Sequence, residues 1–168
     1  MRRATLIGAL LLLYGCGFHP LYGGMNSDMK ETLASIYVEP VPERIGYELR
    51  NTMIDLLDGP GTPGGASYRL KLGLTQTTQG IALQNDIQKN TTITRFNDTL
   101  TVTYELFDAA GHVVTKGTET GLSAYNVLPS SPSANYGTQI AQQDADKRAA
   151  QDIANRIRFD LNVYFSKR

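Results

Sequence analysis

The chain has 168 residues, enough for one ordinary domain with a single core and too few for two large domains. Leu, Ile, Val and Phe make up about a quarter of the residues, and Gly and Pro occur at ordinary levels, which excludes a disordered, collagen-like or low-complexity protein. The formal net charge of 0 gives no general attraction to nucleic acid, and a single cysteine cannot form an intramolecular disulfide.

The N-terminus has the pattern of a secretory signal. Met1-Arg2-Arg3 is basic, and the apolar run at 4–13 is too short to cross a bilayer but long enough for the hydrophobic part of a signal peptide. The run ends in Leu13-Tyr14-Gly15-Cys16, which resembles a bacterial lipobox. We predict that residues 1–15 are a lipoprotein signal peptide and that Cys16 is acylated as the new N-terminus. The alternatives are that Cys16 is a buried, membrane-proximal cysteine, or that this is a plain signal peptide cut elsewhere.

The residue after the cysteine is Gly17 and not aspartate. In enteric-type lipoproteins this arrangement resembles a signal for onward transport to the outer membrane. We therefore expect a lipid-anchored protein of the outer membrane that faces the periplasm. Residues 16–35 contain Pro20, Gly23 and Gly24 and no sustained hydrophobic period, so this segment is interpreted as a lipidated tether. Residues 36–168 are expected to form a single domain.

Hydrophobic periodicity predicts the elements of that domain. A β-rich run at 35–39 ends at two prolines, and a stripe of Ile45, Leu49 and Met53 predicts a helix over 43–57. The glycine-rich loop at 59–65 lacks the Gly-Lys-Ser/Thr ending of a phosphate-binding loop. Apolar and polar residues alternate over 68–75 and over 99–106, which predicts strands over 68–75 and 91–107. A turn at 108–111 then predicts that 112–124 is the hairpin partner of the second of these strands. Twelve threonines lie between 75 and 120, mostly on the non-core face, and suit a sheet face that is solvated or covered by a polar partner.

A long helix is predicted over 136–165. Its apolar residues recur every four positions, at Ala141, Ala145, Ala149, Ile153, Ile157, Leu161 and Phe165. Such a stripe favours packing on the core over an interaction surface. The element order β-α-β-β-β-α predicts an α+β fold: a four-stranded mixed sheet with both helices on one face and the other face open. The first two strands are expected to be parallel because a helix connects them.

Two segments carry a resemblance to a known family. Residues 16–23 (CGFHPLYG) and 139–150 (QIAQQDADKRAA), together with the element order, resemble the lipopolysaccharide-assembly lipoproteins of the LptE family. The resemblance implies a plug that sits in the LptD β-barrel, assists its assembly and helps deliver lipopolysaccharide to the outer leaflet of the outer membrane. It also implies that the chain has no catalytic activity.

The histidines and acidic residues also show no catalytic or metal-binding pattern in the sequence. His19 and His112 lie in the tether and at a hairpin corner, so no pair of histidines has metal-ligand spacing on one element. Asp144 and Asp146 are two apart on a helix and point in different directions, so they are interpreted as solvated charges rather than a carboxylate dyad. We expect no enzyme activity, no metal and no cofactor.

Binding of lipopolysaccharide would need cations directed toward its phosphates and carboxylates. The candidates are Arg69 and Lys71, two apart on one strand, with Lys89 and Arg95 near the start of the next. The alternative is that all four are ordinary solvated charges. The alternative function is a lipid-anchored periplasmic domain that binds or scaffolds another envelope component.

Overall fold

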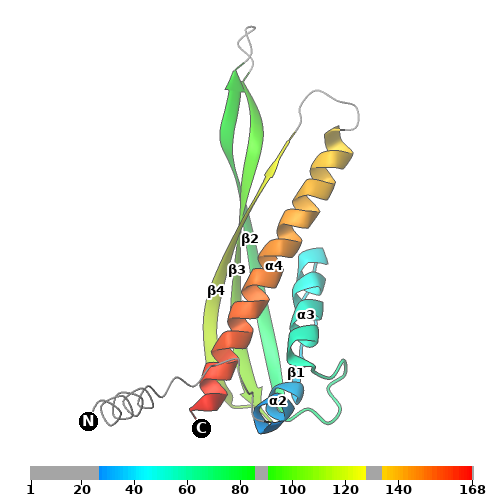
Figure 1. The fold of residues 1–168 in the computed structure, drawn as a ribbon, viewed down its shortest axis with the longest axis vertical. Helices are drawn as coiled ribbons and strands as arrows, with labels where there is room; N and C mark the ends of the chain where they lie inside the picture. The colour runs from blue at the N-terminus through cyan, green and yellow to red at the C-terminus, as the bar shows by residue number, and fades with distance from the viewer. Residues whose placement is uncertain (1–26, 86–90, 128–133, 168) are drawn as a thin grey trace, which may run out of the picture.

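The computed structural model describes residues 27–85, 91–127 and 134–167. In chain order the elements are α2 (Ser27–Ala34), β1 (Ile36–Val38), α3 (Arg44–Leu57), β2 (Tyr68–Asn85), β3 (Thr91–Asp108), β4 (Val113–Asn126) and α4 (Ala134–Ser166). They build a tall, narrow molecule in which a twisted sheet forms one layer and the helices α3 and α4 form the other (Figure 1).

The sheet confirms the predicted fold class. Its strand order is β1-β2-β3-β4. β1 is parallel to β2, and the other two pairings are antiparallel, so the sheet is mixed as expected. β2 and β3 extend well beyond β1, since β1 pairs only with the first three residues of β2. Among the described residues, β1 therefore pairs with only a short part of the β2 edge of the long β2–β3 ribbon.

The core lies between the sheet and the two long helices. Alternate residues of β2 and β3 turn inward, and they meet the predicted stripe of α4, of which Ala145, Ala149, Ile153, Ile157 and Leu161 are buried. Ala150 and Ala154 are also buried, because α4 packs against α3 as well as against β4. At Gly121 of β4, an added Cβ would lie 2.9 Å from Cδ1 of Ile153, so the helix approaches the sheet closely there. Within the described residues, no helix is both long and apolar enough to span a membrane.

Three features differ from the expectation. A third helix, α2, lies inside the segment interpreted as a tether, and its Leu33 is buried in the core next to α3 and α4. β2 runs to Asn85 rather than to Thr75, because its outer half is held by pairing with β3 rather than by an apolar face. The signal peptide, Cys16 and the rest of the tether up to residue 26 lie outside the described residues.

Candidate functional site

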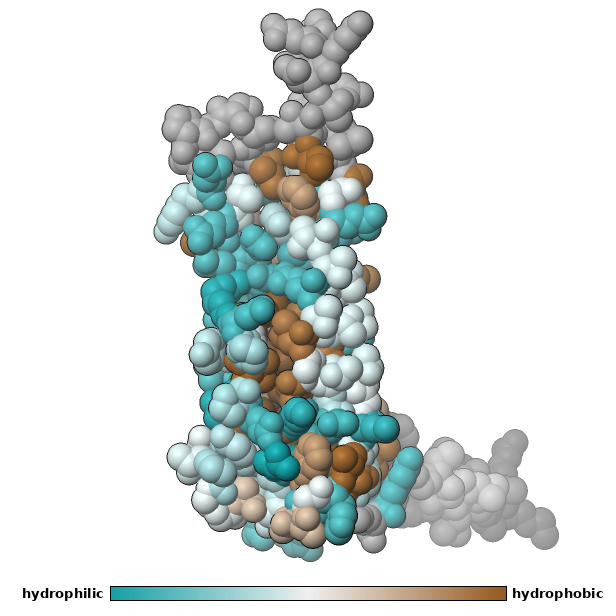
Figure 2. Space-filling model, turned by 180° about the vertical axis from the view of Figure 1, so that it is seen from behind, coloured by the Kyte–Doolittle hydropathy of each residue, from teal (hydrophilic) through white to brown (hydrophobic). Residues whose placement is uncertain are grey.

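The face of the sheet opposite the helices is open and polar. In Figure 2, which shows the molecule from behind, most of the surface over the strands is white or teal, and the brown hydrophobic groups form separate islands. The strand register aligns alternate residues of the three long strands, so that their side chains share this face. They are Arg69, Lys71, Gly73, Thr75 and Thr77 of β2, Thr99, Thr101, Thr103, Glu105 and Phe107 of β3, and Lys116, Thr118, Thr120 and Leu122 of β4. Leu122, on the edge strand β4, is 76% exposed and lies next to Thr99 and Thr120.

One row of this face carries charges of alternating sign. Lys71, Glu105 and Lys116 are register partners across β2, β3 and β4. Neighbouring strands lie about 5 Å apart, so the backbones of the two lysines are about 10 Å apart. The lysines flank a depression of about 630 Å³ that includes Gly73 and Thr103. We call this the lysine depression; its two cations could bind phosphate or carboxylate groups, and its threonine hydroxyls could bind sugar.

The four cations predicted from the sequence do not form one site. Arg69 shares the open face with Lys71, but it is ion-paired with Glu39 and its guanidinium lies 4.5 Å from the centre of the Phe107 ring. Arg95 lies on the same strand as Phe107, twelve residues away, which corresponds to about 40 Å. Lys89 lies outside the described residues. The structure therefore brings Arg69 and Lys71 together, separates Arg95 from them, and adds Lys116.

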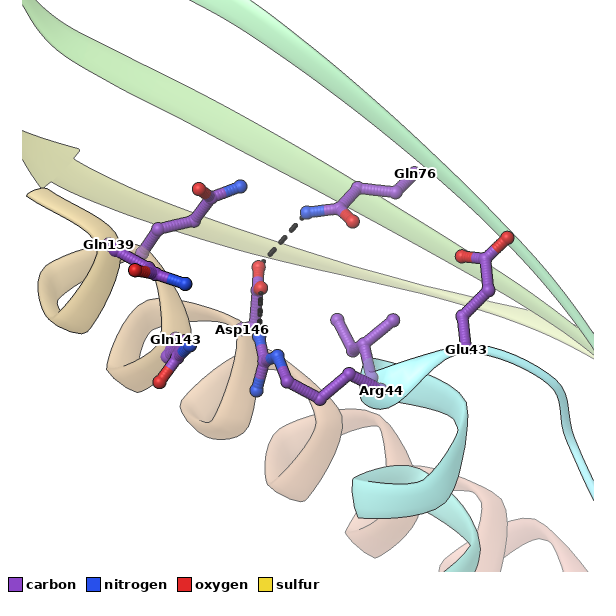
Figure 3. A pocket seen from close by; sticks show the side chains of 8 residues that line it. Glu43, Arg44, Gln76, Gln139, Gln143 and Asp146 are labelled. Carbon is purple, nitrogen blue, oxygen red and sulfur yellow. Dashed lines mark hydrogen bonds and ion pairs between the residues drawn. The ribbon is translucent and has the colours of Figure 1, made fainter. Parts of the chain in front are cut away.

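A second polar site lies on the helix side, where the start of α3 meets α4 and β2 (Figure 3). It is a cavity of about 310 Å³, here called the glutamine pocket. Its lining consists of Glu43, Arg44, Ile45, Gln76, Gln139, Gln142, Gln143 and Asp146. Figure 3 shows Gln76 and Arg44 reaching toward Asp146 from two different elements. Nη2 of Arg44 donates to Oδ2 of Asp146 at 2.7 Å, and Nε2 of Gln76 donates to Oδ1 at 2.9 Å.

The buried carboxylate of Asp146 corrects the interpretation of this residue as a solvated charge. Its side chain is only 6% exposed. Burial raises the pKa of Asp146, and the nearby carboxylate of Asp98 raises it further, while Arg44 and Gln76 oppose both effects. Asp144, two residues earlier, is exposed and pairs with Arg148 on the surface. The two acids therefore point in different directions, but only one of them is solvated.

A further acid lies behind the pocket. Asp98 of β3 is buried and accepts a hydrogen bond from the hydroxyl of Thr78, while its Oδ2 has no partner within the described part of the chain. Tyr125 of β4 stacks on Phe96, and its pKa is raised by burial and by both buried carboxylates. A polar layer thus crosses the interior between the sheet and the first half of α4.

Comparison with known protein families shows which family this chain belongs to. The model of the family described as LptE, lipopolysaccharide-assembly, matches residues 33–161. The chain belongs to the LptE family. It is therefore a member of a lipopolysaccharide-assembly family, and the resemblance found in the sequence is confirmed. No curated protein matches the chain at a significant level.

Solved structures of lipoproteins share the fold. A protein from Caulobacter crescentus CB15 described as a lipoprotein is 28% identical, with a TM-score of 0.65 over 83% of this chain and 96% of its own. A minor lipoprotein from Acinetobacter baumannii is 18% identical, with a TM-score of 0.50 over 76% of this chain and 88% of its own. The rare lipoprotein B from Shewanella oneidensis is 10% identical, with a TM-score of 0.55 over 79% of this chain and 95% of its own. The last two support the fold alone.

Proposed function

We propose that this chain is a non-enzymatic outer-membrane lipoprotein, anchored through Cys16, that plugs and helps assemble an LptD-type β-barrel and helps deliver lipopolysaccharide to the outer leaflet. Membership of the LptE family supports the general role in lipopolysaccharide assembly. The observation that carries the rest is the one-sided architecture, in which the helices cover one face of the sheet and leave a wide polar face open.

The chemistry of the open face fits the inside of a barrel. The interior of a large outer-membrane barrel is polar, so a plug must present hydroxyl and charged groups rather than an apolar surface. The threonines of β2, β3 and β4 supply hydroxyls that both donate and accept hydrogen bonds, on a strand framework that holds them at regular spacing. Leu122 is the large apolar side chain among them and is expected to lie against the barrel wall.

Replacing Leu122 with Arg tests the barrel contact. Because the side chain is exposed, the substitution is expected to change the free energy of unfolding by less than about 0.5 kcal/mol. It should nevertheless place a long charged side chain inside the interface, and we expect at least tenfold less barrel to co-purify with the detergent-extracted lipoprotein. Gln151→Arg, on the exposed side of α4, is the matched control and should retain the barrel.

The same experiment separates the two functions considered. If no β-barrel co-purifies with the wild-type protein, and a different envelope component does so in its place, the protein is a scaffold for that component and the plug role is wrong. Equal recovery of the barrel with both variants would instead place the contact on another face.

The lysine depression provides a separate test of lipopolysaccharide binding. Replacing both Lys71 and Lys116 with Ala removes two cations from one row of the sheet, and each lost charge-assisted contact should cost about 1.5–3 kcal/mol. We expect the affinity of the purified lipoprotein for lipopolysaccharide to fall more than tenfold, with a weaker salt dependence. Lys147→Ala, on α4, is the control. Unchanged affinity and salt dependence in the double variant would show that both lysines are ordinary surface charges.

A further inference from the structure

We propose that the glutamine pocket binds a neutral, hydroxyl-rich sugar unit. The inference rests on the proposed function to the extent that lipopolysaccharide is the source of that sugar. It assigns the saccharide part of the ligand to the helix side of the molecule, away from the lysine depression on the open face of the sheet.

The donors and acceptors of the pocket match sugar hydroxyls. Four of its eight lining residues are glutamines, and each amide offers one acceptor oxygen and two N–H donors. Sugar hydroxyls also donate and accept, so adjacent hydroxyls can be paired by adjacent amides. An apolar ligand such as an acyl chain would leave these amides without partners, and burying an unpaired polar group is costly. The cavity volume of about 310 Å³ lies at the lower end of the range for small-molecule sites.

The charges of the pocket argue against an anionic ligand. Its lining includes two carboxylates, Glu43 and Asp146, and one cation, Arg44. The guanidinium of Arg44 is already paired with the buried Asp146 at 2.7 Å. A phosphate in the pocket would meet the carboxylate of Glu43 without an unpaired cation to balance it. A neutral polyol avoids this repulsion and can accept hydrogen bonds from the guanidinium N–H groups that the ion pair leaves available.

The pocket is held in shape before any ligand binds. Both oxygens of Asp146 are hydrogen-bonded, and its partners belong to α3 and β2, so the carboxylate joins three elements. Glu43 has a φ angle of 68°, a strained conformation for a residue with a Cβ, and its side chain makes no capping hydrogen bond to α3. Glu43 lines the cavity together with Arg44, its neighbour in the sequence. Pre-organised polar groups of this kind lower the entropic cost of binding.

The glutamines of α4 allow a clean test. Gln139 and Gln142 lie three residues apart on the helix side that carries Asp146, so replacing both with Ala removes one wall of the pocket and leaves the ion pair intact. Alanine is at least as good a helix former as glutamine, so α4 should be preserved. Gln151→Ala is the matched control, since it changes the same residue type on an exposed part of the same helix.

The probe is a neutral hexose oligosaccharide released from lipopolysaccharide, without acyl chains, phosphates or acidic sugars, titrated calorimetrically against the full mature lipoprotein in detergent. We expect the wild-type protein and Gln151→Ala to bind it equally, and the Gln139→Ala/Gln142→Ala variant to bind it roughly tenfold more weakly. The Lys71→Ala/Lys116→Ala variant should bind this neutral probe as the wild type does.

The outcomes separate this inference from the proposed function. Binding of intact lipopolysaccharide without binding of the neutral oligosaccharide overturns the inference and leaves the function standing. Equal affinity for the oligosaccharide in all variants, or binding only by lipopolysaccharide fragments that keep phosphates or acidic sugars, also overturns it. If the oligosaccharide binds in a glutamine-dependent manner while intact lipopolysaccharide does not bind, the sugar site stands and the delivery role fails.

Discussion

Replacing Ile157 with Asp is expected to unfold the domain. Ile157 is fully buried on α4, in the cluster that joins α4, α3 and the sheet. The substitution removes the apolar contacts of the side chain and places a carboxyl group among buried apolar side chains, at an expected cost of about 4 kcal/mol or more. Because domains of this size are stabilised by only about 5–15 kcal/mol, a loss of this size removes a large part of the stability. The measurement is the melting temperature of the purified lipoprotein, followed by far-UV circular dichroism.

Arg156→Asp is the control for this prediction. Arg156 is half-exposed, pairs with Asp152 at 2.6 Å and with Glu119 at 3.9 Å, and donates a hydrogen bond to the backbone oxygen of Thr120, so its replacement affects surface polar contacts. Surface pairs contribute about 0–1 kcal/mol, and the melting temperature should fall by a few degrees at most. Equal melting temperatures for the two variants would contradict the packing of α4 on the sheet.

Replacing Cys16 with Ala is expected to abolish acylation completely. In the proposed lipoprotein this thiol accepts the first lipid, so no labelled fatty acid should be incorporated when cells are grown with an alkyne-tagged analogue. The protein should then persist as a soluble form or as a precursor held by its signal peptide, because the buried CH₂ groups of the acyl chains no longer anchor it.

Tyr14→Ala is the matched control for the anchor. Tyr14 occupies the variable position of the proposed lipobox, so this substitution should leave labelling unchanged. Labelling that persists in Cys16→Ala would remove the lipid anchor from the proposed function. Family membership would be unaffected, because the family match covers residues 33–161 and does not include the cysteine.

Regular patterns in the sequence were enough to predict most of the fold. Both strands predicted at 68–75 and 91–107 show alternation, and α4 shows a four-residue stripe. Each pattern reflects burial on one face of a single element, so it can be recognised from the sequence of that element alone. α2 was missed because eight residues with one buried leucine show too little periodicity. The outer half of β2 was missed because residues 76–79 are threonines and glutamines on both faces, which gives no alternation, and its strand conformation depends on pairing with β3.

The candidate sites depended on contacts between distant segments. Lys71 was identifiable as a cation on an open strand face, but its partner in the lysine depression, Lys116, becomes apparent only from the register of β2, β3 and β4. Asp146 was misinterpreted because a helical wheel locates a charge without showing what it meets. Its burial is stabilised by Arg44, 102 residues earlier in the chain.

The sequence by itself determined the family, the α+β class and the one-sided burial of the sheet. Each of these depends on local residue patterns, which can be recognised without knowing which distant residues they contact. The tertiary structure alone decided which polar side chains share a surface and which are buried. That outcome depends on strand register and helix packing, which bring Gln76, Arg44 and Asp146 together from three separate elements. The two hydrogen bonds that Asp146 then accepts offset the cost of burying its carboxylate.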